Sequence, residues 1–376
     1  MWNQVTRFFN KHFYHLLAWF FPPTPQPLPK NPQLILVLST TGIGDSLFDS
    51  AAIKSLKQGH PGAKLVVATH HRRGSVAQHN PFVDEVLPLS KSPLSQLRLL
   101  KFFQNKKPDL VVALRVNEEA VPLGYLLNRH AFVGAVERCQ GFDFLLSHPV
   151  VTHEEKHIVE ETLKVAAVAG GAMVDRGMVY HVCDDELKLL HEHHQNLKKP
   201  FIVFQTGGGK TLAWRNWPVE SYIQAITWLK EHYPHQVILT GGHDNEETGR
   251  AIEIACPWVV NLVQKTTLEE TAALLQEASM LVSTDTGVMH LGFAIGSPTL
   301  ALLHYRSPAS MYGPLDYSPG HQIIELVKPE KANILSQKST QENGIPYNEM
   351  SQIPFEKVTV AMERILGAPV SERARL

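Results

Sequence analysis

Short apolar runs alternate with helical patterns along the chain from residue 34 to residue 303. Such runs are typical of buried strands, and their alternation with helices predicts α/β layers around parallel sheets. The first series comprises strands at 34–39, 64–69 and 109–114 and a helix at 45–58. The second comprises strands at 201–205, 236–240, 259–263, 280–283 and 299–303 and helices at 219–231, 246–255 and 268–278. The pattern therefore predicts two doubly wound units, one after the other.

A polar, histidine-rich stretch at 184–199 separates the two series. We expect a solvated helix and linker there rather than a metal site, because no carboxylate or thiol has complementary spacing. Residues 31–183 are then the N-terminal domain and 200–345 the C-terminal domain. The remaining segment, 346–376, contains a last helix at 356–366 with an apolar face.

The first 21 residues depart from this pattern. They interleave aromatic and leucine side chains with cationic ones, and no acidic residue occurs before Asp45. Their longest apolar run, 16–21, is far shorter than the roughly 20 residues that span a bilayer. A helix lying at the headgroup level of a membrane fits this composition, and a helix docked on the protein's own surface fits it equally well. A proline-rich, stiff spacer follows, so 1–30 is a separate segment.

Composition narrows the classes of function. The 376 residues, 44% of them hydrophobic, are enough for two cores. A formal net charge of -1 gives no overall positive potential that would attract nucleic acid. An anionic partner must therefore bind to a local cationic patch. The three cysteines lack the spacing of a disulfide framework or a zinc site, which fits a reducing cytoplasm.

A glycine turn follows the first strand. Gly42 and Gly44 permit a tight turn and a close approach of a ligand. A dinucleotide fingerprint would need a third glycine where Leu47 stands and an acid where His70 stands, so a nicotinamide or flavin enzyme is disfavoured. Asp45, at the start of the next helix, is then either a favourable charge worth about 0.3–1 kcal/mol there or a general base.

A second glycine-rich loop follows the strand at 201–205. It matches a P-loop poorly, because Phe204 replaces the first glycine and Pro218 starts the helix too far downstream. An ATPase or kinase is therefore a weak hypothesis. Lys210 and Arg215 in this loop can both pair with phosphate oxygens, although one of them can simply be solvated.

The stretch 280–298 predicts a strand, a turn and the start of a helix. The first turn of such a helix offers unpaired N–H groups and the positive end of its dipole to an anion. The polar and glycine residues at this point are Thr284, Asp285, Thr286, Gly287 and His290. A capped helix with a packed histidine is the alternative interpretation.

Other strand ends also carry polar groups, and in parallel sheets ligands bind beyond these carboxyl ends. Asp244 follows the strand at 236–240, where it can bind a ribose hydroxyl or cap the next helix. In the first series a cationic lip suited to an anionic acceptor is expected beside the glycine turn. Its predicted acceptor-binding residues are Thr41, Gly42, Gly44, His71, Arg72 and Arg115.

Together these segments resemble glycosyltransferase family nine, the heptosyltransferases of the bacterial lipopolysaccharide inner core. Three stretches carry the resemblance, which covers residues 34–366. They are Thr-Thr-Gly-Ile-Gly-Asp-Ser-Leu at 40–47, the loop 206–218 with its Arg-Asn-Trp-Pro, and 283–298 with Asp-Thr-Gly followed by Met-His-Leu.

The resemblance implies a GT-B architecture, in which two Rossmann-like, doubly wound domains face a central cleft and the last helix returns to the first domain. It implies inverting transfer of a sugar, as from ADP-heptose, to an anionic lipopolysaccharide-type glycolipid, with no cofactor and no obligatory metal. By position, Asp45 resembles the catalytic base and Arg215 the phosphate-binding cation. The donor contacts implied are Asp285, Thr286, Gly287 and His290.

One stretch departs from the family. Members often carry Gly-Pro-Thr-Asp where this chain has His304-Tyr305-Arg306-Ser307, so its specificity is expected to differ there. We expect a cytoplasmic enzyme held on the inner face of the cytoplasmic membrane by residues 1–21, with no nucleic-acid partner. The alternatives are a catalytically silent nucleotide-sugar or glycan binding protein on the same fold, and a nucleotide-sugar isomerase or hydrolase.

Overall fold

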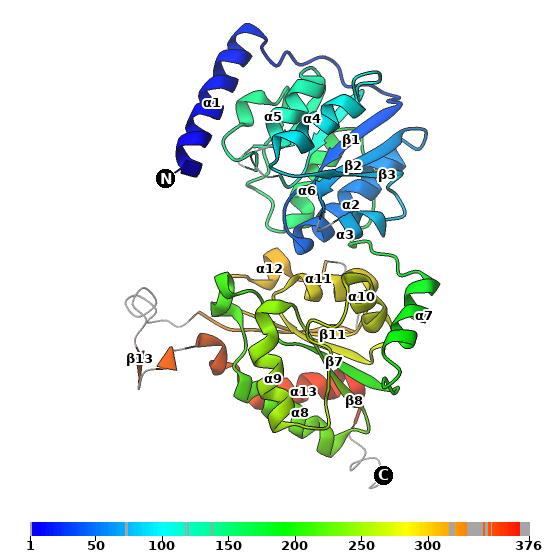
Figure 1. Ribbon diagram of the computed structural model, residues 1–376, viewed down its shortest axis with the longest axis vertical. Helices are drawn as coiled ribbons and strands as arrows, with labels where there is room; N and C mark the ends of the chain where they lie inside the picture. Colours follow the sequence, from blue (N-terminus) through cyan, green and yellow to red (C-terminus); the bar gives the residue numbers. More distant parts are fainter. Residues whose placement is uncertain are drawn as a thin grey trace. The chain divides into compact units, whose positions relative to one another are not determined.

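The computed structural model describes residues 2–71, 74–116, 118, 120–136, 138–315, 320–328, 341–342, 345–346 and 348–368, with the backbone alone at 2–10, 210–211, 341–342 and 345–346. The chain divides into two compact units, Met1–His181 and Val182–Leu376 (Figure 1). Each unit has its own six-stranded sheet, as the alternating pattern predicted. The boundary falls two residues before the predicted end of the N-terminal domain at 183.

The sheet of unit 1 is parallel throughout, with the strand order β3-β2-β1-β4-β5-β6. The strands are β1 (Leu34–Leu38), β2 (Lys64–His70), β3 (Glu85–Leu89), β4 (Leu110–Ala113), β5 (Phe132–Ala135) and β6 (His148–Val150). β1 pairs with β2 on one side and with β4 on the other. The connections therefore diverge between β1 and β4, which makes this the topological switch point where ligands of such sheets bind.

Helices cover both faces of this sheet. They are α1 (Trp2–Phe20), α2 (Ile43–Gly59), α3 (Gly74–Gln78), α4 (Pro93–Phe102), α5 (Ala120–Asn128) and α6 (Ile158–Val168), with the 3-10 turn η2 (Asp143–Leu145). Successive strand residues point to opposite faces. Leu36 therefore packs in the core shared with α1, α4 and α5, whereas Val37 packs in the core shared with α2, α3 and α6.

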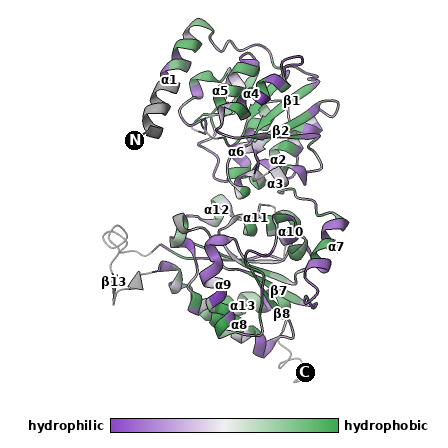
Figure 2. Ribbon diagram, in the orientation of Figure 1, coloured by the Kyte–Doolittle hydropathy of each residue, from purple (hydrophilic) through white to green (hydrophobic). Residues whose placement is uncertain are grey.

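The sheet of unit 2 repeats this plan, with the order β12-β11-β10-β7-β8-β9. The strands are β7 (Phe201–Gln205), β8 (Gln236–Thr240), β9 (Val260–Asn261), β10 (Met280–Thr284), β11 (Thr299–Leu303) and β12 (Gln322–Glu325). β7 pairs with both β8 and β10, so the switch point of this unit lies between β7 and β10. The hydrophobic residues concentrate in the strands of both sheets (Figure 2).

Unit 2 contains the remaining elements. The α-helices are α7 (Asp184–His193), α8 (Val219–His232), α9 (Glu246–Ala255), α10 (Leu268–Glu277), α11 (Gly287–Ile295), α12 (Ala309–Tyr312) and α13 (Phe355–Leu366). The 3-10 turns are η3 (Lys210–Arg215), η4 (His243–Asn245) and η5 (Glu349–Gln352), and β13 (Gln341–Glu342) pairs with β14 (Ile345–Pro346). The core on one face joins the strands to α8, α9 and α13, while α11 packs on β10 and β11.

α7 forms where a solvated helix was expected, and most of its residues are exposed. Leu190 is buried and His193 contacts Glu270 of α10 at 2.6 Å, so the segment packs on unit 2. One expectation, about the last helix, needs correction. α13 buries Val358 and Met362 in the core of unit 2. The prediction that the last helix returns to the N-terminal domain is therefore wrong for this helix.

α1 docks on unit 1 with one face only. Tyr14, Leu17 and Ala18 pack against the core shared with α4 and α5, and the Tyr125 hydroxyl donates a hydrogen bond to the carbonyl of Phe21. The apolar side chains that stay exposed are Phe13, Leu16, Trp19, Phe20 and Phe21. The expectation of a docked helix thus holds for one face, and the other face remains apolar. No helix in the described part of the chain has both the length and the hydropathy that a membrane crossing requires.

Candidate active site

Asp45 lies at the switch point of unit 1, in the first turn of α2. Its Oδ2 accepts a hydrogen bond from Gly42 N at 2.9 Å, which satisfies one of the unpaired donors of the helix start. Its Oδ1 lies 2.7 Å from Nε of Arg115, the second residue after β4. The carboxylate side chain is nevertheless 28% exposed. Asp45 therefore caps the start of α2 and is still accessible to solvent, as a general base must be.

Arg115 joins the two loops at this switch point. Its carbonyl accepts hydrogen bonds from Thr40 N at 2.9 Å and from Thr41 Oγ1 at 3.4 Å. Its Nη1 is buried and has no hydrogen-bond partner among the described residues. Because a buried donor without a partner is costly, this nitrogen is suited to an oxygen of a bound ligand.

A second carboxyl group lies one helical turn after Asp45 and was not among the predicted residues. Asp49 is fully buried, and its Oδ2 accepts a hydrogen bond from Ser39 Oγ at 2.5 Å. Burial raises the pKa of Asp49 to about 8, and the charge of Asp45 acts in the same direction. The Ser39 hydrogen bond and the charge of Arg115 oppose this rise. Near neutral pH the buried carboxyl group of Asp49 therefore keeps its proton.

The predicted acceptor residues are only partly brought together. Thr41, Gly42 and Gly44 lie in the turn and first helical residues around Asp45, beside Arg115. His71 instead follows β2, is exposed, and lines a separate cavity between β3 and α4. Arg72 lies outside the described residues. Of the predicted cationic lip, the described part of unit 1 therefore contains two residues. They are Arg115 at the switch point and His71 farther along the sheet.

Asp285 lies at the switch point of unit 2, between β10 and α11, and only 3% of it is exposed. It forms an ion pair with Nη1 of Arg215, and its Oδ1 lies 3.3 Å from Nε2 of His290. Burial acts to raise the pKa of Asp285, but the hydrogen bond and attraction of His290 and the charge of Arg215 outweigh it. With a further hydrogen bond from Ser307, this pKa is lowered to about 2. Asp285 is thus a buried anion that fixes two cationic or donor groups.

The start of α11 is a capped helix N-terminus, the feature on which the prediction of an anion site rests. Thr286 is the N-cap, and its Oγ1 accepts a hydrogen bond from Met289 N at 3.3 Å. Ser283 Oγ lies 3.2 Å from Thr286 Oγ1 and holds it in place. Gly287 is the first helical residue, with its N–H in the turn that offers donors to an anion. Thr284, the last residue of β10, is fully buried, so it supports this turn from the side of the core.

The glycine loop after β7 brings Arg215 to the same point. Gly207 has φ +112°, a left-handed conformation that favours glycine. Gly208 N donates to Asn216 Oδ1 at 2.7 Å, and a Cβ at Gly208 would lie 3.6 Å from Thr286. Nε of Arg215 is buried without a hydrogen-bond partner among the described residues. A guanidinium nitrogen and helix N–H groups therefore converge, as binding of a diphosphate requires.

Two other predicted donor residues, Asp244 and Lys210, lie in the loops after β8 and β7. Asp244 is exposed in η4, and the N-cap of α9 is Asn245, so Asp244 does not cap that helix. Its Oδ2 would lie 2.9 Å from a Cβ at Gly209, which places it beside the glycine loop. The side chain of Lys210 lies outside the described residues.

The segment that departs from the family forms a buried polar cluster behind the Arg215 loop. His304 is fully buried, with Nε2 2.6 Å from Glu349 Oε2 and Nδ1 accepting from Arg306 N at 3.1 Å. Burial lowers the pKa of His304, with the Arg306 charge acting in the same direction and Glu349 opposing it, so the neutral ring donates to Glu349. The ring centroid of Trp214 lies 4.7 Å from that of His304. No local pattern links residues 45 positions apart, so the sequence could not reveal this cluster.

Sequence comparison identifies the family. The model of "Glycosyltransferase family 9 (heptosyltransferase)" matches residues 109–342, which is more than half of the chain. This chain belongs to glycosyltransferase family 9. It is therefore a glycosyltransferase, and the resemblance seen in its motifs is confirmed.

Curated relatives of this family 9 enzyme are similar to it over between two fifths and four fifths of their length. Lipopolysaccharide heptosyltransferase 3 of Escherichia coli is 24% identical over 275 residues, which cover 69% of this chain and 80% of the relative. Lipooligosaccharide heptosyltransferase 2 of Haemophilus influenzae is 31% identical over 152 residues, covering 39% of this chain and 42% of the relative.

Solved structures confirm the GT-B type of fold, with two Rossmann-like units, for the family 9 enzyme. A family 9 glycosyl transferase from Veillonella parvula has a TM-score of 0.75 at 19% identity, covering 91% of this chain and 99% of that one. The E. coli ADP-heptose lps heptosyltransferase II has a TM-score of 0.70 at 21% identity, covering 88% of this chain and 98% of that one. At these identities the structures show the shared fold.

Proposed function

We propose that this enzyme transfers heptose from ADP-heptose to a lipid-linked, anionic acceptor of the lipopolysaccharide core, with inversion and without a metal or other cofactor. The observation that carries the proposal is the Arg215–Asp285–α11 cluster, where a guanidinium and a helix N-terminus converge as they do around a diphosphate. The names of its relatives, all of them heptosyltransferases of lipopolysaccharide or lipooligosaccharide, support heptose as the sugar.

In this mechanism Asp45 removes the proton from the acceptor hydroxyl as its oxygen attacks C1 of the sugar. The bond between C1 and the diphosphate oxygen breaks on the opposite side, and the nucleotide diphosphate leaves with the bonding electrons. Arg215 and the N–H groups at the start of α11 stabilise the charge that develops on the leaving group. The protein's own cations thus supply the charge stabilisation that a metal ion supplies in other transferases.

Asp45→Asn tests the base. We expect kcat to fall by roughly 10²–10⁴-fold, because the amide cannot accept the proton. The affinity for ADP-heptose should stay unchanged, since that ligand is assigned to unit 2. Steady-state transfer assays with binding measured by calorimetry would separate the two effects. A folded Asp45→Asn enzyme with full transfer activity contradicts the assignment.

Donor identity is tested by thermal unfolding in the presence of nucleotide diphosphate sugars. A donor at 100 times its Kd stabilises the folded protein by about 2.7 kcal/mol. ADP-heptose is expected to raise the Tm more than its UDP- and GDP-sugar counterparts at equal concentration. Equal shifts with all of them would argue against ADP-heptose as the donor.

The exposed face of α1 supports a place for the enzyme on the inner, cytoplasmic surface of the cytoplasmic membrane. Trp19 is 75% exposed, and Phe13, Leu16 and Phe20 share its face of the helix. Aromatic and leucine side chains on a helix without acidic residues bind at the headgroup level of anionic bilayers. Substituting Trp19→Glu should weaken binding to anionic vesicles about tenfold or more. Trp258→Glu is the matched control, because Trp258 is an exposed tryptophan in unit 2.

A further inference from the structure

The helices on one face of the unit 1 sheet come from segments that contain no acidic residue. Residues 1–44, 86–108 and 120–136 supply α1, α4 and α5, and none of them contains Asp or Glu. The middle segment carries five cations, which are Lys91, Arg98, Lys101, Lys106 and Lys107. On the opposite face, α2 and α6 carry both signs, with the acids Asp45, Asp49, Glu160 and Glu161 and the lysines Lys54, Lys57 and Lys164. The α1–α4–α5 layer is therefore the more positive of the two faces of unit 1.

α4 adds exposed apolar side chains to this positive layer. Leu94 is 58% exposed, Leu97 61% and Phe102 49%. These side chains and the exposed face of α1 belong to the same layer, in which apolar and cationic residues outnumber the acidic ones. Such a surface matches the headgroup and acyl boundary of an anionic bilayer, which attracts each nearby Lys or Arg.

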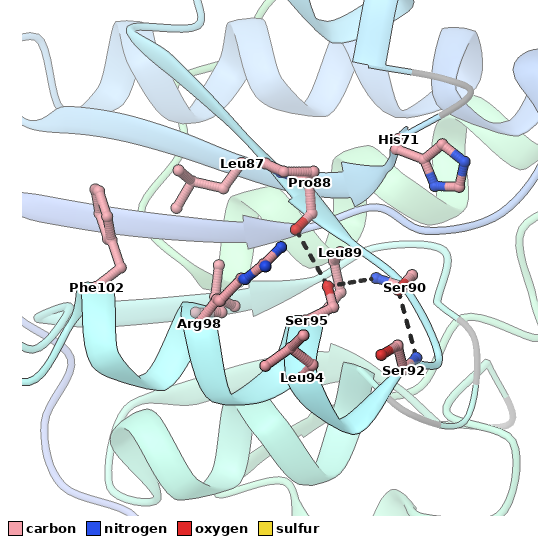
Figure 3. Close-up of a pocket in the computed structure, with 11 residues that line it drawn as sticks. His71, Leu87, Pro88, Leu89, Ser90, Ser92, Leu94, Ser95, Arg98 and Phe102 are labelled. Carbon is pink, nitrogen blue, oxygen red and sulfur yellow. Dashed lines mark hydrogen bonds between the residues drawn. The ribbon is translucent and has the colours of Figure 1, made fainter.

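A cavity of about 350 Å³ lies between α4 and the edge strand β3, a size typical of small-molecule sites. Its lining residues are Leu87, Pro88, Leu89, Leu94, Leu99 and Phe102 on the apolar side and His71, Ser90, Ser92, Ser95 and Arg98 on the polar side. Figure 3 shows Leu87 and Phe102 at one end, the serines toward the other, and Arg98 directed from α4 toward β3 between them. The cavity thus has one apolar end, at Leu87 and Phe102, and one mixed end where Leu89 and Leu94 lie among the serines, so it can accept an amphiphile.

The polar groups of this cavity leave Arg98 available. Ser95 Oγ accepts from Ser90 N at 3.0 Å, and Ser92 N donates to Ser90 Oγ at 3.4 Å. None of the residues drawn in Figure 3 is hydrogen-bonded to Arg98. Pro88 has no N–H to offer on the edge strand, so it disfavours the addition of another strand there.

We infer that this cavity holds one anionic phospholipid of the membrane, with its phosphate on Arg98 and a hydrocarbon chain between Leu87 and Phe102. A guanidinium is suited to bind two phosphate oxygens at once, and the hydroxyls of Ser90 and Ser92 can donate to the others, whereas that of Ser95 donates to the carbonyl of Pro88 at 3.5 Å. The inference rests on the proposed membrane association and adds to it a second, lipid-specific contact in unit 1.

The position of the cavity favours a bilayer lipid over the lipid part of the acceptor. β3 lies two strands from β1, about 10 Å at the usual strand spacing, so the cavity is displaced from Asp45. Most of its lining comes from β3 and α4, and α4 packs in the same layer as α1. A lipid held there would keep the positive layer against the membrane whether or not acceptor is bound.

Vesicle binding by the full-length protein tests the headgroup contact. Without acceptor, the wild type should sediment with phosphatidylcholine vesicles that contain phosphatidylglycerol and bind pure phosphatidylcholine vesicles more weakly. Arg98→Gln should lower binding to the anionic vesicles about fivefold, the effect of one arginine near such a surface. Lys156→Gln, an exposed cation outside this layer, should leave binding unchanged. Equal binding by the Arg98→Gln protein and the wild type would overturn the inference.

Photolabelling tests the chain-binding end. Phosphatidylglycerol with a diazirine in its acyl chain should label peptides from 85–102 in the wild type, and Arg98→Gln should reduce that labelling while labelling of α1 persists. Labelling confined to α1, or labelling of 85–102 that appears only when glycolipid acceptor is added, would each contradict a bilayer-lipid site. The second result would assign the cavity to the acceptor.

Transfer to a deacylated, water-soluble acceptor keeps this inference distinct from the proposed reaction. Arg98→Gln should match the wild type in kcat and KM there, because Arg98 does not contact either switch point. A wild type that binds anionic vesicles but transfers no heptose would overturn the proposed reaction and leave the lipid site standing. A variant whose KM for the soluble acceptor rises would overturn the lipid site instead.

Discussion

Asp45 and Asp285 each follow the strand at the switch point of their unit, and each lies against an arginine from the facing loop. In unit 1 the side chains of Asp45 and Arg115 are 28% and 16% exposed. In unit 2 those of Asp285 and Arg215 are 4% and 19% exposed. Both pairs lie at a switch point, but the acid follows the first strand of unit 1 and the fourth strand of unit 2. The carboxylate is thus open in unit 1 and closed in unit 2.

This difference separates two tasks. An exposed carboxylate can reach a substrate hydroxyl and exchange a proton with it. A buried carboxylate held by Arg215 and His290 keeps its charge and orients its partners, so the arginine rather than the acid is presented to a ligand. The neighbouring acid sharpens the contrast, because Asp49 beside Asp45 is held protonated whereas Asp285 is held ionised.

The largest expected difference between the two pairs is in the unfolding free energy that is lost when the arginine is removed. Arg215→Met leaves the Asp285 charge buried without its ion-pair partner, which costs about 3–5 kcal/mol of unfolding free energy. Arg115→Met exposes an already accessible carboxylate, and we expect a loss of about 0–1 kcal/mol. Urea denaturation of both variants measures this difference. Equal losses would mean that the two pairs are energetically equivalent.

Asp49 should make unit 1 less stable as pH rises. Its pKa is about 8 in the folded protein against an ordinary value of 3.8, so the folded state binds the extra proton between these values. The stability it contributes is complete below pH 4 and is lost as pH rises toward 8. Asp49→Asn should remove this slope and be more stable than wild type at pH 7, by as much as about 4 kcal/mol. Thermal unfolding from pH 5 to pH 8 tests it, and parallel curves for the two proteins would contradict the prediction.

Asp285 should give unit 2 the opposite response. Its pKa is about 2 in the folded protein and about 3.8 when unfolded, so here the unfolded state takes up the proton first. This stability is present above pH 4 and is lost as pH falls toward 2, by about 2–3 kcal/mol in total. Comparing the wild type with Asp285→Asn between pH 5 and pH 2.5 isolates the contribution. An unchanged acid slope in the variant would refute it.

A smaller difference is expected in the unfolding free energy that the N-cap side chains contribute at the two switch points. Thr286→Ala removes the side-chain oxygen that accepts from Met289 N, which costs about 1 kcal/mol. Thr286→Ser keeps the oxygen and should recover most of this loss. The corresponding cap of α2 is Gly42, which has no side chain to lose, so the effect belongs to unit 2 alone. A loss well below that value would show that Ser283 or water replaces the cap.

The sequence predicted the two sheets because alternation of apolar runs and helices is a local property that the fold preserves. It also predicted that Asp45, Arg215 and Asp285 lie at the carboxyl ends of strands, where ligands of parallel sheets bind, and their roles in catalysis stay predictions. Asp49 was missed although its spacing from Asp45, one helical turn, is visible in the sequence. The location of α13 was predicted wrongly, because an apolar face shows that a helix docks but not which core receives it.

The side-chain cluster around His304 could not be predicted at all. Glu349 contacts His304 across 45 residues, and Asn348 Nδ2 donates to the carbonyl of Asn216 at 2.9 Å across 132. Pairings of this kind depend on tertiary packing and leave no periodic mark on the chain. They explain why a segment that looked only like a departure from the family turns out to brace the Arg215 loop.

The contact between Asn348 and Asn216 also has a consequence for how the protein is made. The chain is synthesised from its N-terminus, so Arg215 and its glycine loop emerge long before the residues that brace them. The Asp45 turn has all its contacts once unit 1 has been made. The arginine loop gains its support only after residue 348 has been synthesised, so a nascent or truncated chain ending before that residue would combine an ordered Asp45 turn with an unbraced Arg215 loop.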